Sequence, residues 1–223
     1  MPTDLADLVA PAHTGLVLFE LQRGVVGDHH AMAALDARTA DPDLLPRLAA
    51  LAGAARAAGV RVVHCVVEWR ADRAGTIVSS PLLGAMTKRP DHVLAGSPSA
   101  EIVPELAPRP EDLISVRTSG VSPFTATTLD HLLRAEHVST VVAAGAGLTI
   151  GLLGLAIEAV GLGYSVVIPS DGYLDADPDY ARLVWERTLR LLVTPTTTAE
   201  LIGTWRGVIR RTPAVPGGPG RSD

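Results

Sequence analysis

The order of apolar and polar residues along the chain predicts strands and helices in alternation. Short apolar runs, several of them rich in valine, predict β-strands at residues 15–21, 60–67, 112–117, 140–144 and 165–169. Apolar residues recur with helical spacing at 42–58, 127–135, 150–162, 178–193 and 198–206. Strands that alternate with helices form a mostly parallel sheet with helices on both faces. The pattern therefore predicts a three-layer α/β/α fold, which we place in a single domain over residues 1–211.

Two segments depart from this alternation. Residues 72–98 have weak periodicity, several Gly and Pro residues and the cluster Ser-Ser-Pro. We interpret them as a long excursion over the surface, with a lid over a binding site as one interpretation, and we expect substrate specificity to lie there. Residues 212–223 are rich in Pro and Gly, a composition typical of a disordered tail.

Composition and charge narrow the classes of partner. The 223-residue chain is 47% hydrophobic, with a mean hydropathy of +0.27 and a formal net charge of −5. The sequence has no run of Arg or Lys, which argues against nucleic acid as a partner. The longest uncharged stretch, residues 138–157, is punctuated by glycines, so a strand followed by a helix explains it better than a membrane span. Residues 1–12 lack the apolar core of a signal peptide, and we expect a cytoplasmic protein.

The cysteine and histidine content argues against a metal centre. A single cysteine excludes an internal disulfide and a cysteine-built zinc site. Cys65 lies within the apolar run 60–67, where a buried and inert thiol is the favoured interpretation. His29 and His30 are adjacent in a predicted loop, and we favour a solvated pair over the alternative of metal ligands. We expect no metal and no other cofactor.

Residues with potential chemical roles follow the predicted strands. Glu20 lies at the end of the first strand, Trp69 follows the second and Arg117 ends the third. The glycine-rich segment 145–151 follows the fourth strand. In sheets of this kind, ligands bind beyond the carboxyl ends of the strands. We therefore expect these residues to converge on a small-molecule site at one edge of the sheet.

Four stretches resemble, in order and spacing, the isochorismatase-like hydrolases, also known as cysteine hydrolases. They are GLVLFELQ at 15–22, EIVPELAPRPEDLISVR at 101–117, SPFTATTLDHLLRAEHVSTVVAAG at 122–145 and GAGLTIGLLGLAIEAVGLGYSVVIPSD at 145–171. The resemblance covers residues 14–205. It implies the family's three-layer α/β/α fold, a small-molecule hydrolase, and assembly into homodimers or homotetramers.

The catalytic triad that the resemblance implies, Asp, Lys and Cys, is altered at every position. Glu20 stands at the Asp position and Gly151 at the Cys position. The Lys position falls on Arg117, with Thr118 as a competing alignment because the following loop is one residue longer than usual. A cysteine at a helix N-terminus is activated by the helix dipole and a nearby cation, and glycine supplies no thiol. We therefore expect no thioester intermediate.

The resemblance implies further binding residues in the loop before Gly151. The family has a non-proline cis peptide there, which carries over to Ala146–Gly147. The backbone N–H groups of this peptide and of Gly151 would bind an anion or a carbonyl oxygen. A plain strand-to-helix turn is the alternative. Ile150, next to Gly151, belongs to the same candidate binding loop.

Two aromatic side chains complete the candidate pocket. For Trp69, just past a strand end, a pocket wall and a packing role are equally supported. For Phe124, packing beneath the site is favoured over a place in the pocket wall. The glycines of segment 145–151 lack the third glycine of a dinucleotide-binding loop at its proper spacing, so we do not expect a dinucleotide.

Three functions remain open at this point. The relatives that resemble true isochorismatases carry Gly at the position of Gly151 and cleave an enol ether, which requires a general acid rather than a nucleophile. We assign the acid to Glu20 and the binding of a substrate carboxylate to Arg117, through two parallel hydrogen bonds. The second function is a catalytically silent protein in which Glu20 and Arg117 form a buried ion pair, and which binds a ligand or serves as an oligomer subunit. An amidase that uses Cys65 is the least favoured.

Overall fold

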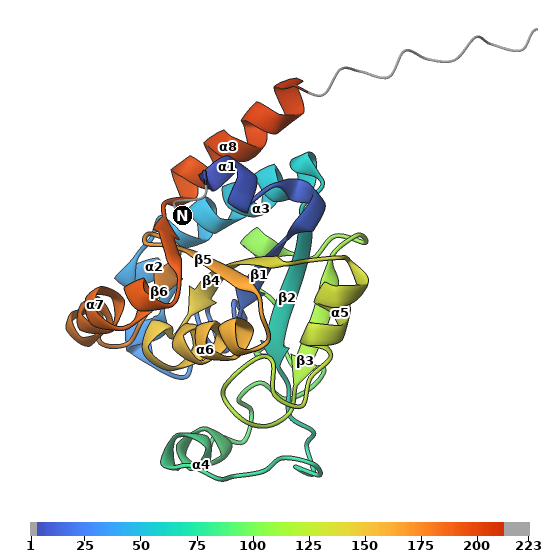
Figure 1. Ribbon diagram of the computed structural model, residues 1–223. Coiled ribbons are helices and arrows are strands. Elements are labelled where there is room, and N and C mark those ends of the chain that lie inside the picture. Colours follow the sequence, from blue (N-terminus) through green and yellow to red (C-terminus); the bar gives the residue numbers. More distant parts are fainter. Residues whose placement is uncertain (1–3, 212–223) are drawn as a thin grey trace, which may run out of the picture.

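All pairings between the named strands of the sheet are parallel, as the alternation of strands and helices predicts. The computed structural model describes residues 4–211. Its seven-stranded sheet has the order β3-β2-β1-β4-β5-β7, with β6 beside β4 (Figure 1). The strands are β1 (Thr14–Phe19), β2 (Arg61–Val67), β3 (Leu113–Arg117), β4 (Thr140–Ala146), β5 (Ser165–Pro169), β6 (Tyr173–Leu174) and β7 (Thr194–Thr196).

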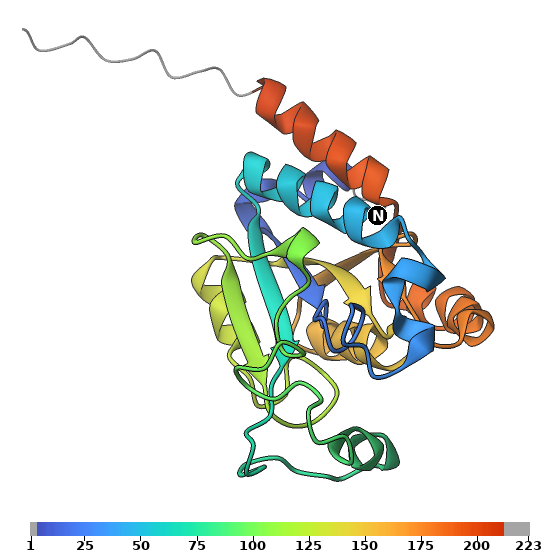
Figure 2. The ribbon, with the colours of Figure 1, turned by 180° about the vertical axis from the view of Figure 1, so that it is seen from behind.

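Helices cover both faces of the sheet, which confirms the three-layer α/β/α prediction. Alternate residues of β1 enter two separate cores: Leu16 and Leu18 pack with α3 and α8, and Val17 and Phe19 pack with α5, α6 and α7. Both ribbon views show α3 and α8 side by side (Figures 1 and 2). The helices are α1 (Leu5–Leu8), α2 (Ala37–Ala40), α3 (Leu44–Ala58), α4 (Pro81–Thr87), α5 (Leu129–Ala135), α6 (Leu153–Gly161), α7 (Pro178–Arg187) and α8 (Thr198–Arg211).

Several predicted boundaries move in the structure. β1 ends at Phe19 rather than residue 21, because Glu20 adopts a φ of +51°, outside the extended region. The helix predicted at 178–193 ends at Arg187, and the last helix runs on to Arg211. β7 is an edge strand that contains Pro195, which the apolar pattern did not reveal. The tail predicted at 212–223 lies outside the described residues.

The uncharged stretch 138–157 forms β4, a π-helical turn at Leu148–Leu152 and the first part of α6. Among the described helices, none has the length and apolar character needed to cross a bilayer.

A buried cluster of polar side chains ties α3 to the strands β2 and β3. Asp112 directly precedes β3 and has a side chain only 1% exposed. Its carboxylate accepts hydrogen bonds from Arg56 (Nε–Oδ1 3.0 Å, Nη2–Oδ2 2.6 Å) and from the N–H of Arg109 (2.9 Å), and it lies 3.2 Å from Nε2 of His64. Burial alone would raise the pKa of Asp112, but the hydrogen bonds, above all those from Arg56, lower it below 3.8. This cluster keeps its charges paired within the fold.

The segment predicted to cross the surface contains a short helix. α4 begins at Pro81, and Ser80 caps it by accepting the N–H of Leu83 (3.3 Å). Both ribbon views place α4 apart from the other helices, at the end of the molecule toward which β2 and β3 point (Figures 1 and 2). The carboxyl ends of parallel strands are where such sheets bind ligands, so α4 lies on the functional side.

Candidate active site

Glu20 and Arg117 meet at the carboxyl ends of the strands. Arg117 ends β3 and reaches across the end of β2 to donate a hydrogen bond to Glu20 Oε1, and it also donates to the carbonyl of Gly120. The side chains are 5% exposed for Arg117 and 13% exposed for Glu20. The two charges therefore neutralise each other away from bulk water, in an ion pair that buried charges require.

The backbone of Glu20 is held in an uncommon conformation. Its φ of +51° lies in the left-handed region, which non-glycine residues seldom adopt. Its N–H donates to the carbonyl of Cys65 at 2.8 Å, which fixes the turn at the end of β1. Strained residues of this kind persist where the surrounding structure holds them, and they collect at functional sites. The turn directs the Glu20 side chain toward Arg117.

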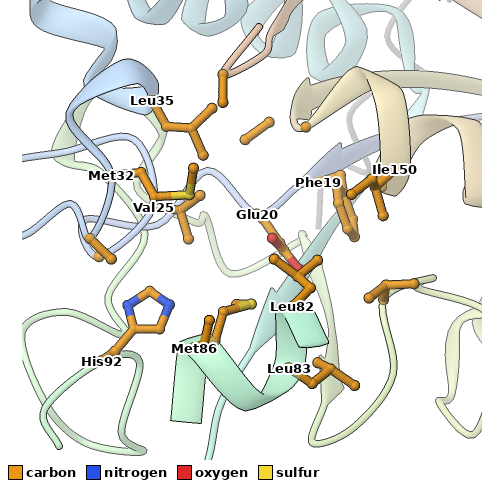
Figure 3. A pocket seen from close by; sticks show the side chains of 18 of the residues that line it. Phe19, Glu20, Val25, Met32, Leu35, Leu82, Leu83, Met86, His92 and Ile150 are labelled. Carbon is orange, nitrogen blue, oxygen red and sulfur yellow. The ribbon is translucent and has the colours of Figure 1, made fainter. Parts of the chain in front are cut away.

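A cavity of about 260 Å³ opens beside this ion pair. Glu20 and Arg117 contribute to its wall, and the remaining wall is largely apolar. The segment after β1 and the helix α4 face each other across it (Figure 3). The apolar side chains that they contribute are Val25, Met32, Leu35, Leu82, Leu83 and Met86. The cavity therefore suits a small molecule with an apolar body.

The position expected for a nucleophile is filled from another strand. Gly151 lines the cavity, but a Cβ added there would overlap Cε1 of Phe19 and lie 3.0 Å from its Cδ1 and Cζ. Phe19 is 2% exposed and packs its ring where the side chain of residue 151 would begin. The absence of a thiol is thus matched by the packing around it.

Gly151→Cys is expected to destabilise the fold by about 1–3 kcal/mol, because the ring of Phe19 must move to admit the new side chain. Chemical denaturation measures the change. The matched control is Gly154→Cys on α6, where an added Cβ meets its nearest neighbour, Ser122, at an ordinary 3.6 Å. Equal denaturation midpoints for the two variants would contradict the close packing of Phe19 against Gly151.

The prediction of a cis peptide at Ala146–Gly147 is wrong. No cis peptide occurs in the described part of the chain, and the backbone donors of this loop are already in use. The N–H of Gly147 donates to the carbonyl of Leu174 (2.8 Å), and the N–H of Gly151 donates to the carbonyl of Gly147 (2.8 Å). The first bond arises because β6 pairs with the end of β4. Both N–H groups are therefore paired within the chain.

A carboxylate of the chain itself occupies the start of the π-helical turn. Asp175 accepts the N–H of Thr149 at 2.8 Å and its hydroxyl at 2.9 Å. Both residues line the cavity. Because a helix N-terminus attracts anions, Asp175 takes the place that a ligand anion would otherwise have there. Sequence reasoning did not find Asp175, which is separated from Thr149 by 26 residues.

The structure brings six of the nine predicted site residues to the cavity and leaves three away from it. The residues that line it are Glu20, Arg117, Ala146, Gly147, Ile150 and Gly151. Trp69 is fully buried, and its ring packs against His92 and under the guanidinium of Arg73. Phe124 packs on Tyr164, with ring centroids 5.9 Å apart. Thr118 is exposed, so Arg117 and not Thr118 faces the cavity.

The sole cysteine lies in the core rather than in the cavity. Cys65 is 2% exposed and packs on the face of the sheet that α5 and α6 cover. Burial raises the pKa of its thiol, which disfavours the reactive thiolate. His29 is about half exposed, and His30 Nδ1 lies 2.9 Å from the carbonyl of Gly27. Over residues 4–211, no group of three or more potential ligands is placed to hold a metal ion.

Comparisons with known proteins agree with this fold. The model of the isochorismatase domain matches residues 14–200. A cysteine hydrolase from Pseudomonas syringae pv. phaseolicola 1448A superposes with a TM-score of 0.76 at 22% identity, over 90% of this chain and 96% of that one. An isochorismatase family protein from Desulfovibrio vulgaris subsp. vulgaris str. Hildenborough gives a TM-score of 0.72 at 27% identity, over 89% and 98%.

A more distant neighbour has a named activity. N-carbamoylsarcosine amidase from Thermoplasma acidophilum gives a TM-score of 0.66 at 20% identity, over 83% of this chain and 96% of that one. At this identity, as with the Pseudomonas structure, the likeness concerns the fold alone. No curated protein matches the sequence. The domain match spans most of the chain, so the chain belongs to the isochorismatase family.

Proposed function

We propose that this protein is a small-molecule hydrolase that uses acid–base chemistry at Glu20, without a thiol nucleophile, on an anionic enol ether or a related metabolite. The observation that carries the proposal is the Glu20–Arg117 pair in the wall of a cavity that Gly151 also lines. Gly151 stands where the nucleophile is expected and has no side chain. A carboxyl group can transfer a proton and a guanidinium can bind a carboxylate.

Substrate binding would convert the ion pair into an acid. A substrate carboxylate that takes over the donors of Arg117 leaves Glu20 without its cation, next to apolar side chains such as Phe19 and Val25. The Glu20 carboxylate, no longer held by a cation, can then take up a proton from the solvent. In that protonated form Glu20 is able to donate a proton.

The hydrolysis then needs only this proton and water. The carboxyl proton of Glu20 is transferred to the terminal carbon of the enol ether, whose π electrons form the new C–H bond. The ether oxygen stabilises the resulting oxocarbenium ion, and water adds to its carbon and returns a proton to the Glu20 carboxylate. The bond between the hemiketal carbon and the ether oxygen then breaks, the hemiketal hydroxyl becomes the carbonyl of the ketone, and its proton passes to the ether oxygen of the departing alcohol.

The test is turnover of isochorismate, a panel of other enol ethers and small amides by the wild type and by Cys65→Ala. We expect turnover of an enol ether that survives in Cys65→Ala, because the thiol is buried outside the cavity. Cys65→Ala also shortens a core side chain, so its thermal unfolding is measured in parallel. Hydrolysis of an amide that stops on replacement of Cys65, with the fold intact, would overturn the proposal.

A second candidate is ligand binding without turnover. It is favoured by the closed state of the site, in which Arg117 donates to Glu20 and Gly120 while Gly147 and Gly151 donate to backbone carbonyls. Saturable binding of enol ethers by a wild type that turns none of them over would favour this candidate.

A further inference from the structure

His92 is a buried side chain in the wall of the same cavity. It follows α4, is 7% exposed, and meets Trp69 in an edge-on contact with ring centroids 5.7 Å apart. Figure 3 shows an edge of its imidazole ring turned toward the cavity, on the same side as Met86. Neither the triad positions that the resemblance implies nor the acid–base chemistry proposed above makes use of this residue.

The hydrogen-bonding state of His92 follows from what surrounds its two nitrogens. Nδ1 is buried and has no hydrogen-bond partner among the described residues, whereas Nε2 is not enclosed in this way. A buried N–H without an acceptor is rarer than a buried acceptor without a donor. The proton is therefore assigned to Nε2, the nitrogen on the ring edge that faces the cavity (Figure 3).

The charge of His92 is fixed by its position. Burial, together with the positive charges of Arg89 and Arg73, lowers the pKa of His92 to about 4. The imidazole is neutral at physiological pH and offers one N–H donor. Arg89 lies in the same cavity wall, and its positive charge favours a ligand atom with negative or partly negative charge nearby.

We propose that the Nε2–H of His92 donates a hydrogen bond to an acceptor oxygen of the ligand, at the end of the ligand away from Glu20. The ligand class is then a small molecule with three parts: an anionic group for Arg117, an apolar body against Leu82 and Met86, and an acceptor oxygen, such as a ketone, for His92. The inference rests on the proposed function only in giving the anionic group to Arg117.

Packing alone does not account for a histidine at this position. A phenylalanine would keep the edge-on contact with Trp69 and would leave no buried nitrogen without a partner. The cost of leaving Nδ1 unpaired is offset if Nε2 of the same ring binds a ligand, and a ligand in the cavity could accept that hydrogen bond.

The test compares ligands that differ only in the acceptor. The probes are straight-chain carboxylates of six to nine carbons with a ketone at the carbon next to the terminal methyl. Each is paired with an analogue in which a =CH₂ group replaces the ketone oxygen, so that the shape is kept and the acceptor is lost. Titration calorimetry gives the Kd of each with the wild type, His92→Phe and the control His131→Phe, whose histidine is exposed on α5. The chain lengths cover the unknown span between the two polar groups.

We expect at least one ketone to bind the wild type and His131→Phe about threefold to tenfold more tightly than its methylene analogue, as one hydrogen bond provides. In His92→Phe the preference should reverse, because the methylene analogue is the more apolar ligand. A wild type with no ketone preference at any chain length, or a preference that His92→Phe retains, would overturn the inference.

Two further measurements keep the result interpretable. If His92→Phe unfolds, NMR of ¹⁵N-labelled histidine in the wild type replaces it. The His92 ring is expected to show the ¹⁵N chemical shifts of the neutral Nε2–H tautomer, and the Nε2 resonance must move on addition of the ketone and not of its analogue. Because binding is measured rather than turnover, a ketone preference without any catalysis would sustain this inference while the proposed hydrolysis fails. Catalysis without a ketone preference would do the reverse.

Discussion

Replacement of Glu20 by Gln is expected to lower kcat by about 100- to 10,000-fold for the enol ether that the wild type turns over, the range lost with a general acid. Glutamine keeps the length of the side chain, and its amide oxygen can still accept from Arg117, but it carries no acidic proton. The substrate carboxylate would still bind Arg117 in the variant, so KM should change much less than kcat. Steady-state kinetics on the two proteins gives both parameters.

The control for this substitution is Glu186→Gln, which makes the same chemical change on the exposed surface of α7. It should leave kcat and KM unchanged. Glu20→Gln also removes the charge that balances the 5% exposed guanidinium of Arg117, so a lower stability is expected and unfolding must be followed for each variant. A folded Glu20→Gln protein with wild-type kcat would exclude Glu20 as the acid.

The elements that could be predicted are those whose burial or end is visible in a short run of the sequence. β5 occupies residues 165–169 as predicted, because a parallel strand buried on both faces is a continuous apolar run. α3 ends at residue 58 as predicted, because Gly59 adopts a φ of +83° that stops a helix. β6 and β7 escaped prediction because strands of two and three residues have no periodicity to detect.

The features of the candidate site also fall into those that the sequence predicts and those that it does not. Strand ends are predictable, and the expected proximity of Glu20 and Arg117 appears as an ion pair. The partners of Gly147, the carboxylate of Asp175 and the placement of His92 depend on tertiary contacts that no local pattern records. The failed cis-peptide prediction also belongs here, since it was carried over from the resemblance and no local pattern in the sequence tests it.

Removal of the Asp112 carboxylate is expected to cost about 3–5 kcal/mol of unfolding free energy in Asp112→Ala, because a buried ion pair would lose one partner. The guanidinium of Arg56 is 10% exposed and would keep its charge with no anion beside it, and the N–H of Arg109 and the ring of His64 would each lose their acceptor. Denaturant unfolding followed by circular dichroism measures the loss.

The matched control is Asp72→Ala, because Asp72 makes the same two-bond contact with Arg70 (2.9 and 2.8 Å) and also accepts a backbone N–H, yet it is exposed. Its removal should leave the unfolding midpoint nearly unchanged, as for surface ion pairs in general. The difference between the two variants isolates burial. Because the pKa of Asp112 is lowered in the fold, its stabilisation is complete above pH 3.8 and is lost as the pH falls through the lowered value. The gap in stability between wild type and Asp112→Ala must therefore narrow in acid, and a gap independent of pH would show that the carboxylate charge is not its source.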